Sequence, residues 1–431
     1  MFESLLVANR GEIARRIIAT ANGMGIRTIA VYSEADADLP FVREADEAVL
    51  LGPAAPAQSY LDVDAVLAAA KQTGAQAVHP GYGFLSENAD FAEAVTAAGL
   101  TWVGPSPEAM RSMGDKIAAR NRMAAAGVPV APGTPDPVPD AQAALAAAHE
   151  IGYPVMVKAA AGGGGIGMSA AFNDEELTAA YETARTRAER FFSDPAILLE
   201  KYVPSARHIE VQILGLADGT VVALGERGCS VQRRHQKVAE ESPSPAVTPE
   251  LRAAIMDAAV KAGEAVGYRN AGTVEMLFDT ATGDAWFLEM NTRLQVEHPV
   301  TEAVTGLDLV AEQLRIAAGE APSFDAANVP TASGHAIELR IYAEDPKRFL
   351  PGPGAITEWV EPTGDGVRVD AGYESGNTVT PFYDPLLAKL IVHGSSRQEA
   401  LAMARAAVEG FTVVGPKNNL PFFTELLAND E

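Results

Sequence analysis

The sequence predicts a protein of mixed α/β and α+β class, with an N-terminal open parallel α/β domain followed by two further domains. Its 431 residues allow roughly three domains at about 150 residues each. Strand and helix patterns alternate over the first hundred residues, which is typical of a parallel sheet with crossover helices. A new pattern starts near Gly114, and a loose stretch at 322–333 precedes the last region. We therefore expect domains at 1–113, 114–333 and 334–431.

Short apolar runs in 1–113 alternate with stretches of helical periodicity. Runs of this length, bounded by turn residues, are typical of buried strands. We expect the following order: strand 5–8, helix 12–21, strand 27–32, helix 60–72, strand 75–79, helix 88–98 and strand 100–103.

The second region contains a compact module, which we place at about 135–203. A proline-rich stretch at 128–137 precedes it and excludes regular structure there. Within it we expect a helix capped by Asp140, strand 154–159, a glycine loop, strand 168–172, a helix from Asn173 and strand 196–200. Because the module is small and flanked by loops, we expect it to move as a unit, as a lid.

Composition and charge exclude several classes of protein. The chain is 48% apolar and 21% charged, and its formal net charge is 33 − 57 = −24. So acidic a chain is poorly suited to nucleic-acid polymers or anionic membranes. Cys229 is the only cysteine, so no intramolecular disulfide forms. No apolar run approaches the ~18 residues of a membrane helix, and the N-terminus lacks a signal peptide, so we expect a cytoplasmic protein.

A glycine run at 162–165 follows Lys158 and lies between two expected strands. Successive glycines bring backbone N–H groups close to a ligand, and such N–H groups suit phosphate oxygens. The run matches neither the Walker loop nor the dinucleotide fingerprint. We therefore expect a flap over phosphates, with a flexible surface hairpin as the alternative.

A predicted hairpin of strands 270–279 and 284–293 brings acidic residues together. Folding near Thr282 places Glu275 opposite Glu289, with Asn291 on the same face. Two carboxylates across a hairpin repel each other, and a divalent cation relieves that repulsion. Carboxylate and amide oxygens are ligands that Mg²⁺ prefers, so we expect a metal site here. A slipped register, with one glutamate in solvent, is the alternative.

Two segments offer a site for small anions. The stretch 232–237 is cationic and rich in amides, although it is also compatible with a solvated face. In 293–298, Arg293 and Gln295 are suited to holding a small anion while Glu297 takes its proton, unless Glu297 is an ordinary surface acid. Together with the glycine flap and the metal hairpin, these features predict phosphoryl transfer from a nucleoside triphosphate to an anionic acceptor.

The chain resembles biotin carboxylase, an ATP-grasp family, over essentially its whole length. The motifs that carry the resemblance lie at 6–14, 79–88, 113–116, 229–237, 289–302, 338–346 and 350–354. The resemblance implies an N-terminal α/β domain, an ATP-grasp domain with a mobile glycine-rich lid, and a C-terminal mixed α+β domain. It also implies that ATP phosphorylates bicarbonate to carboxyphosphate, and that biotin is then carboxylated.

The same resemblance implies roles for individual residues. ATP would contact Lys116, Lys158, Gly163, Gly164, Gly165, Glu200, Lys201, Tyr202, His208, Gln232, His235 and Leu277. Mg²⁺, with Mn²⁺ as the alternative, would bind Glu275, Glu289 and Asn291. Bicarbonate would lie against Lys237, Arg293, Gln295 and Val296. Glu297 would be the base and Arg340 would stabilise the biotin enolate, with Lys237 and Arg293 also in the catalytic set.

The chain has no Ala-Met-Lys-Met string, the usual site of biotin attachment. We therefore expect biotin on a separate carrier protein or domain, a separate carboxyltransferase, and a homodimer. We expect neither nucleic acid nor membrane as a partner. An acyl-CoA is the favoured final acceptor, with urea or a ketoacid as alternatives.

The chain departs from the family pattern at two positions. Ile166 replaces the usual basic residue of the glycine loop, and Tyr342 stands where asparagine is common. The first change removes an ionic contact from the closed lid, and the second lies beside Arg340. Two further functions stay open, namely an ATP-grasp ligase for another carboxylate and a nucleotide-binding regulatory module without catalysis.

Overall fold

The computed structural model describes residues 1–159, 168–192, 195–233 and 236–429. The N-terminal region forms a five-stranded parallel sheet of order β3-β2-β1-β4-β5. Its strands are β1 (Ser4–Val7), β2 (Arg27–Ser33), β3 (Glu47–Gly52), β4 (Ala77–His79) and β5 (Thr101–Trp102). Its helices are α1 (Gly11–Gly23), α2 (Pro40–Glu44), α3 (Val63–Thr73), α4 (Ala89–Ala97) and α5 (Pro107–Gly114). The expected order of elements is confirmed. Sequence analysis missed the short helices α2 and α5 and the half-exposed edge strand β3.

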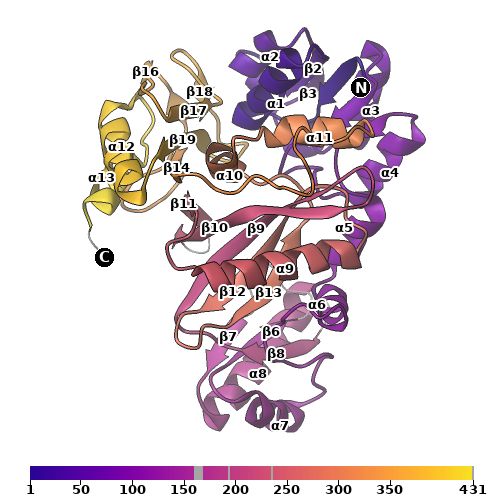
Figure 1. The fold of residues 1–431 in the computed structure, drawn as a ribbon, viewed down its shortest axis with the longest axis vertical. Helices are drawn as coiled ribbons and strands as arrows, with labels where there is room; N and C mark the ends of the chain where they lie inside the picture. Colours follow the sequence, from indigo (N-terminus) through magenta and orange to yellow (C-terminus); the bar gives the residue numbers. More distant parts are fainter. Residues whose placement is uncertain (160–167, 193–194, 234–235, 430–431) are drawn as a thin grey trace.

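The expected lid module forms a small separate layer, which lies at the end of the molecule farthest from the N-terminal sheet (Figure 1). It contains a three-stranded sheet of order β7-β6-β8 with its own apolar core. Its elements are α7 (Ala141–Ile151), β6 (Val155–Ala159), β7 (Met168–Ala171), α8 (Asp174–Phe192) and β8 (Ile197–Lys201). Asp140 caps α7 by accepting a hydrogen bond from the backbone of Ala143, as expected. Helix α6 (Lys116–Ala125) precedes the module.

An eight-stranded antiparallel sheet forms the centre of the molecule, in the order β13-β12-β9-β10-β11-β14-β19-β17. Its first strands are β9 (Ala206–Gly215), β10 (Val221–Arg233), β11 (Gln236–Ser242), β12 (Asn270–Asp279) and β13 (Ala285–Asn291). The sheet continues with β14 (His335–Tyr342), β17 (Val367–Ala371) and β19 (Leu386–Gly394). Because β11 pairs with β14, the sheet crosses the expected boundary at 333 without a break, and the domain limits stay predictions.

Helices cover this sheet, and shorter strands complete the C-terminal region (Figure 1). The helices are α9 (Pro249–Ala265), α10 (His298–Thr305), α11 (Leu309–Ala317), α12 (Arg397–Gly410) and α13 (Leu420–Ala428). The shorter strands are β15 (Gly354–Ala355), β16 (Glu358–Val360), β18 (Thr378–Val379) and β20 (Thr412–Val414). Two 3₁₀ turns, Glu34–Asp36 and Pro56–Gln58, lie in the N-terminal region. Among the residues described, no helix combines the length and the apolar character that a membrane crossing requires.

The two faces of β14 have opposite character. Ile337, Leu339 and Ile341 belong to the large apolar core that includes residues of α12. Because side chains alternate along a strand, Glu338 and Arg340 lie on the other face, and α10 packs against this strand as well. Both side chains are nevertheless buried. Charged groups therefore lie inside the molecule on this face of the sheet.

Candidate active site

The acidic hairpin has the register that side-chain alternation predicts. Glu275 on β12 is the cross-strand partner of Glu289 on β13, so the slipped register is excluded. Asn291 lies on the same side, since its Nδ2 donates to Oε1 of Glu275 at 2.8 Å. Arg293 follows and donates to Oδ1 of Asn291 at 3.0 Å. The hairpin thus gathers two carboxylates, an amide and a guanidinium at one place.

The donor set of this hairpin fits Mg²⁺. Its carboxylate and amide oxygens are hard ligands on neighbouring strands. Ammonium groups balance the carboxylates, with Lys116 Nζ 3.1 Å from Glu289 and Lys237 Nζ 3.0 Å from Glu275. A cavity of about 270 Å³ opens beside Glu289 and Asn291, between α5, α6 and β13. The site is therefore rich in acids that attract cations, and it has open space next to them.

Lys237 lies at the centre of the site, among three carboxylates. Its Nζ donates to Glu210 at 2.6 Å, to Glu275 at 3.0 Å and to Glu297 at 2.7 Å. Burial alone would lower the pKa of Lys237, but the carboxylates outweigh burial and raise it well above its ordinary value. The ammonium is therefore a permanent charge that bridges the metal hairpin and the expected base.

Glu297 is buried, which excludes an ordinary surface acid. Its Oε2 accepts a hydrogen bond from Nη2 of Arg340 at 3.0 Å, while Lys237 binds Oε1. Burial opposes its ionisation, but Lys237, Arg340 and Arg227 together hold the pKa of Glu297 well below its usual range. The carboxylate is ionised at neutral pH and able to accept a proton.

Arg227 is a residue that sequence analysis missed, although it donates hydrogen bonds to several buried residues that support the site. Its guanidinium is fully buried and pairs with Glu210. It also donates to Gln295 at 3.0 Å. Further hydrogen bonds reach Gln212, Thr273 and Thr301. The charged pair Glu226 and Arg227, which follows the apolar run 221–224 and Gly225 within an expected strand-rich region, was the available signal.

Glu87, from the loop before α4, holds the expected anion-binding arginine. It accepts a hydrogen bond from Nε of Arg293 at 2.9 Å and another from the backbone N–H of Thr292 at 3.1 Å. The stretch 79–88 is one of the motifs that carry the family resemblance, but the sequence did not single out Glu87. Its role follows from a contact between residues 206 positions apart.

The expected ATP residues divide into two groups. His208 and Gln232 join the metal hairpin, because His208 Nε2 lies 2.9 Å from Glu275 and Gln232 Nε2 lies 3.0 Å from His208 Nδ1. Leu277 is the cross-strand partner of His208. Lys158 and Glu200 form an ion pair on the lid sheet.

The expected ATP residues Lys201 and Tyr202, next to Glu200 in the chain, make contacts within the lid module itself. Lys201 donates to the carbonyls of Gly152 and Tyr153, so its ammonium binds the module itself. Tyr202 packs edge-on against Phe172. Gly163, Gly164, Gly165, Ile166 and His235 lie outside the described residues.

The remaining expected residues lie around Arg340. Val296 offers its carbonyl, which accepts a hydrogen bond from Lys389 at 3.2 Å. Burial raises the pKa of Tyr342 to about 12, so its phenol stays neutral beside Arg340. Arg233 belongs to the stretch that was expected to be cationic, but its charge is balanced, since it pairs with Glu344 at 2.6 Å and stacks on Phe349. The site is therefore a set of balanced ion pairs and not a bare cationic pocket.

Comparisons with known proteins agree with this geometry. The biotin carboxylase N-terminal domain matches residues 1–110, the carbamoyl-phosphate synthase L chain ATP-binding domain matches 115–323, and the biotin carboxylase C-terminal domain matches 338–431. Biotin carboxylase 2 of Bacillus subtilis is 53% identical over 99% of this chain and 96% of its own length. A pyruvate carboxylase subunit of Methanothermobacter thermautotrophicus is 49% identical over 100% of this chain and 87% of its own length.

A solved structure adds ligands to the comparison. It is the biotin carboxylase domain dimer of Hydrogenobacter thermophilus 2-oxoglutarate carboxylase, in complex with MgADP, ADP and bicarbonate. It superposes with a TM-score of 0.91 at 43% identity, covering 100% of this chain and 94% of that chain. The three family models together cover nearly the whole chain, and the relatives each match it over 99% or more, so the protein belongs to the biotin carboxylase family of ATP-grasp ligases.

Proposed function

We propose that the chain catalyses the ATP- and bicarbonate-dependent carboxylation of biotin that is carried on a separate protein. One observation carries the proposal, which is that Lys237 contacts both Glu275 of the metal hairpin and Glu297. A phosphate-binding cation site and a carboxylate base therefore lie on two sides of one ammonium group. Phosphoryl transfer to a small acid needs cations that neutralise the phosphates and a group that activates the attacking oxygen.

In the first step the chain's own residues bind and deprotonate bicarbonate. Lys237, Arg293, Gln295 and the backbone of Val296 hold the anion beside Glu297. The bicarbonate O–H proton passes to Glu297, and the freed oxygen attacks the terminal phosphorus of ATP as ADP leaves. The products of this step are ADP, carboxyphosphate and a protonated Glu297.

Positioning and charge neutralisation supply most of the catalysis in such a transfer. Glu275, Glu289 and Asn291 would hold Mg²⁺, which neutralises charge on the phosphates when bound. Lys116, Lys158, His208 and Gln232 face the same phosphates, with Glu200, Lys201, Tyr202 and Leu277 toward the nucleoside. Gly163, Gly164 and Gly165 of the expected flap, together with His235, are the remaining proposed ATP contacts.

In the second step carboxyphosphate divides into CO₂ and phosphate. Phosphate takes the proton of the biotin ring nitrogen, and that nitrogen attacks CO₂. Arg340 stabilises the negative charge that develops on the ureido oxygen of biotin. Tyr342, next to Arg340 on the approach, shapes that side of the biotin site.

Carrier, carboxyltransferase and a second copy of the chain are the proposed partners. An acyl-CoA is the favoured final acceptor, and the similarity to a pyruvate carboxylase subunit keeps ketoacids open, with urea as the third class. Isolating the proteins that copurify with the chain, and assaying carboxyl transfer to each acceptor, decides among these classes.

The test of the proposed function is an ATPase assay with and without bicarbonate. We expect ADP release that depends on bicarbonate and rises with free biotin, and we expect Glu297→Gln to bind ATP but lose that turnover. ADP release indifferent to both compounds would contradict the proposal. Acyl phosphate trapped from another acid would favour a different ligase, and no ATPase at all would favour a regulatory module.

A further inference from the structure

The buried charged face of the large sheet contains a pair of glutamates that the proposed reaction does not use. Glu240 on β11 is the direct cross-strand partner of Glu338 on β14. Arg340, two residues beyond Glu338, is in turn the cross-strand partner of Lys389 on β19. Directly opposed residues lie on one face of a sheet, so all four side chains share the face on which Arg340 meets Glu297.

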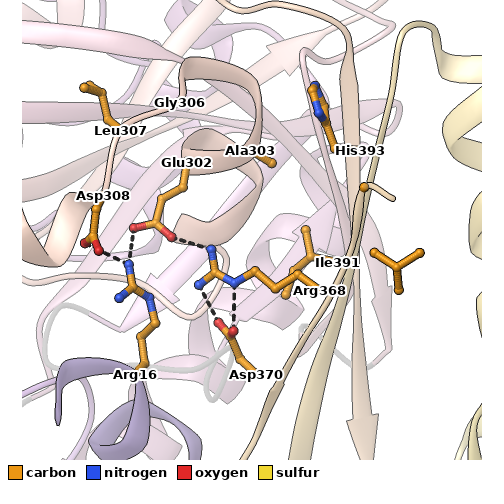
Figure 2. Close-up of a pocket in the computed structure, with 12 residues that line it drawn as sticks. Arg16, Glu302, Ala303, Gly306, Leu307, Asp308, Arg368, Asp370, Ile391 and His393 are labelled. Atoms are coloured by element: carbon orange, nitrogen blue, oxygen red, sulfur yellow. Dashed lines mark hydrogen bonds and ion pairs between the residues drawn. The ribbon is translucent and has the colours of Figure 1, made fainter. Parts of the chain in front are cut away.

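The other acids near this face have cationic partners. Glu12 lies 3.0 Å from Lys389. Around a cavity of about 540 Å³, Asp370 pairs with Arg368 at 2.7 Å, and Glu302 pairs with Arg16 at 2.6 Å (Figure 2). The chain therefore neutralises buried carboxylates along this face by direct ion pairs, as buried charges require.

Glu338 is the exception among the described residues. It is fully buried, and neither of its oxygens has a hydrogen-bond partner or an ion pair there. Glu240 is also buried, with one ion pair between its Oε1 and Nη2 of Arg340 at 2.5 Å. Two ionised carboxylates facing each other in this setting would repel strongly and lack solvation. A proton on one of them removes both costs.

We propose that Glu240 and Glu338 share one proton, and that this singly charged pair is a positioning device that holds Arg340 against Glu297. Nη2 of Arg340 is the common contact, 2.5 Å from Glu240 and 3.0 Å from Glu297. Glu240 is the ionised member because it holds the guanidinium, and Glu338 is the neutral acid beside it. The importance of this position rests on the roles of Arg340 and Glu297 in the proposed function.

Burial has the largest effect on the pKa of both glutamates, and the neighbouring charges act in both directions. Burial raises the pKa of Glu240 to about 7, although Arg340 and Lys237 oppose the rise and Glu297 adds to it. Burial also raises the pKa of Glu338 well above its ordinary value, against Lys389 and Arg340 and together with Glu240 and Glu297. The single-proton state is thus present above about pH 7. At higher pH the second proton leaves, and an unpaired charge on Glu338 then competes with Glu297 for Arg340.

The first experiment detects the proposed proton on the Glu240–Glu338 pair directly and does not depend on enzymatic activity. Infrared difference spectra of the full chain, recorded across pH, report the carbonyl stretch of a protonated carboxyl group. We expect a buried-acid band at pH 8 in the wild type that Glu338→Gln removes. Glu241→Gln is the matched control, because Glu241 is the next residue of β11 but pairs with His335 and Arg397. A wild-type chain without the band at pH 8, or a band that survives Glu338→Gln, overturns the shared proton.

The second experiment reads the position of Arg340 through the pH profile. Glu338→Gln cannot lose a proton, so we expect the alkaline fall of biotin-stimulated turnover to move to higher pH. Glu240→Gln removes the ion pair that holds Arg340, so we expect the KM for biotin to rise about tenfold. We expect the accompanying fold decrease in kcat to be smaller. Profiles identical to that of Glu241→Gln overturn the positioning role. A wild-type chain without bicarbonate-dependent turnover instead contradicts the proposed function, and the infrared band still decides whether the pair shares a proton.

Discussion

Nζ of Lys237 lies 2.7 Å from Oε1 of Glu297, and the carboxylate end of this contact is buried. The same ammonium touches Glu210 and Glu275, so one cation compensates three acids from three other segments of the chain. Removing only one partner of a buried ion pair destabilises the folded state strongly, because the remaining charge stays buried without compensation. The contact therefore links the stability of the site directly to its chemistry.

Replacing Lys237 tests this link. We expect Lys237→Met to lower the free energy of unfolding by about 3–5 kcal/mol and to lower kcat by on the order of 100-fold. Urea unfolding and the bicarbonate-dependent ATPase measure the two effects. Lys261→Met is the control, since Lys261 forms an exposed pair with Asp257 and should change stability by less than about 0.5 kcal/mol. Equal effects of the two variants would contradict the central role of Lys237.

Arg227 offers a second test, because it supports Gln295 and Glu210 through a planar fork that lysine lacks. We expect Arg227→Lys to cost about 2–4 kcal/mol of stability and to raise the KM for bicarbonate more than the KM for ATP. Thermal unfolding and initial-rate kinetics check this. Arg27→Lys, at an exposed pair with Glu47, should leave both quantities as they are.

Glu87 is expected to act on bicarbonate through Arg293. Without its carboxylate, the Nε of Arg293 loses a charged hydrogen bond of 2.9 Å. We expect Glu87→Gln to raise the KM for bicarbonate roughly 5- to 30-fold, from about 1–2 kcal/mol of lost interaction. Asp90→Asn removes an acid from a surface pair with Arg111 nearby and should leave that KM unchanged. A normal KM in Glu87→Gln would show that Arg293 does not need this partner.

The metal hairpin predicts a shifted Mg²⁺ requirement. We expect Glu289→Gln to raise the Mg²⁺ concentration for half-maximal ATPase about tenfold or more, because one hard anionic ligand becomes a neutral amide. Titration with magnesium chloride measures this. Asp284→Asn, an exposed position in the turn of the same hairpin, serves as the control. An unchanged requirement in Glu289→Gln would place the metal elsewhere.

Glu12 predicts how stability depends on pH. Burial raises its pKa from 4.5 to about 7, although Lys389 opposes the rise. A folded-state pKa above the unfolded one means that the folded state binds the proton more tightly, so stability is lost as pH rises from 4.5 to about 7. In the wild type, we expect the free energy of unfolding to fall by about 2–3 kcal/mol between pH 5 and pH 7 because of Glu12, and we expect Glu12→Gln to remove this fall. Urea unfolding at the two pH values measures it. A slope equal to that of Glu3→Gln, an exposed acid, would contradict this assignment.

Local patterns predicted much of the fold and part of the site. Strand alternation placed Glu275 opposite Glu289, because the turn and the register of a hairpin are local. Most strands and helices of the N-terminal region followed from apolar runs and helical periodicity, whereas α2, α5 and β3 did not. Glu87 and Arg227 were not predicted, because their roles arise from contacts between distant segments. The pairing of Glu240 with Glu338 depends on β11 meeting β14, which no local pattern reveals.

The unbroken central sheet also has a consequence for synthesis. Strand β11 ends at Ser242, but its partner β14 begins only at His335. At about 5–20 residues per second, roughly 5 to 20 seconds of translation separate the two strands. During that interval the unpaired edge of β11 is a template for pairing with other chains. Charged side chains on a strand edge disfavour such pairing, so we expect Lys237, Glu240 and Glu241 of β11 to limit aggregation of the nascent chain.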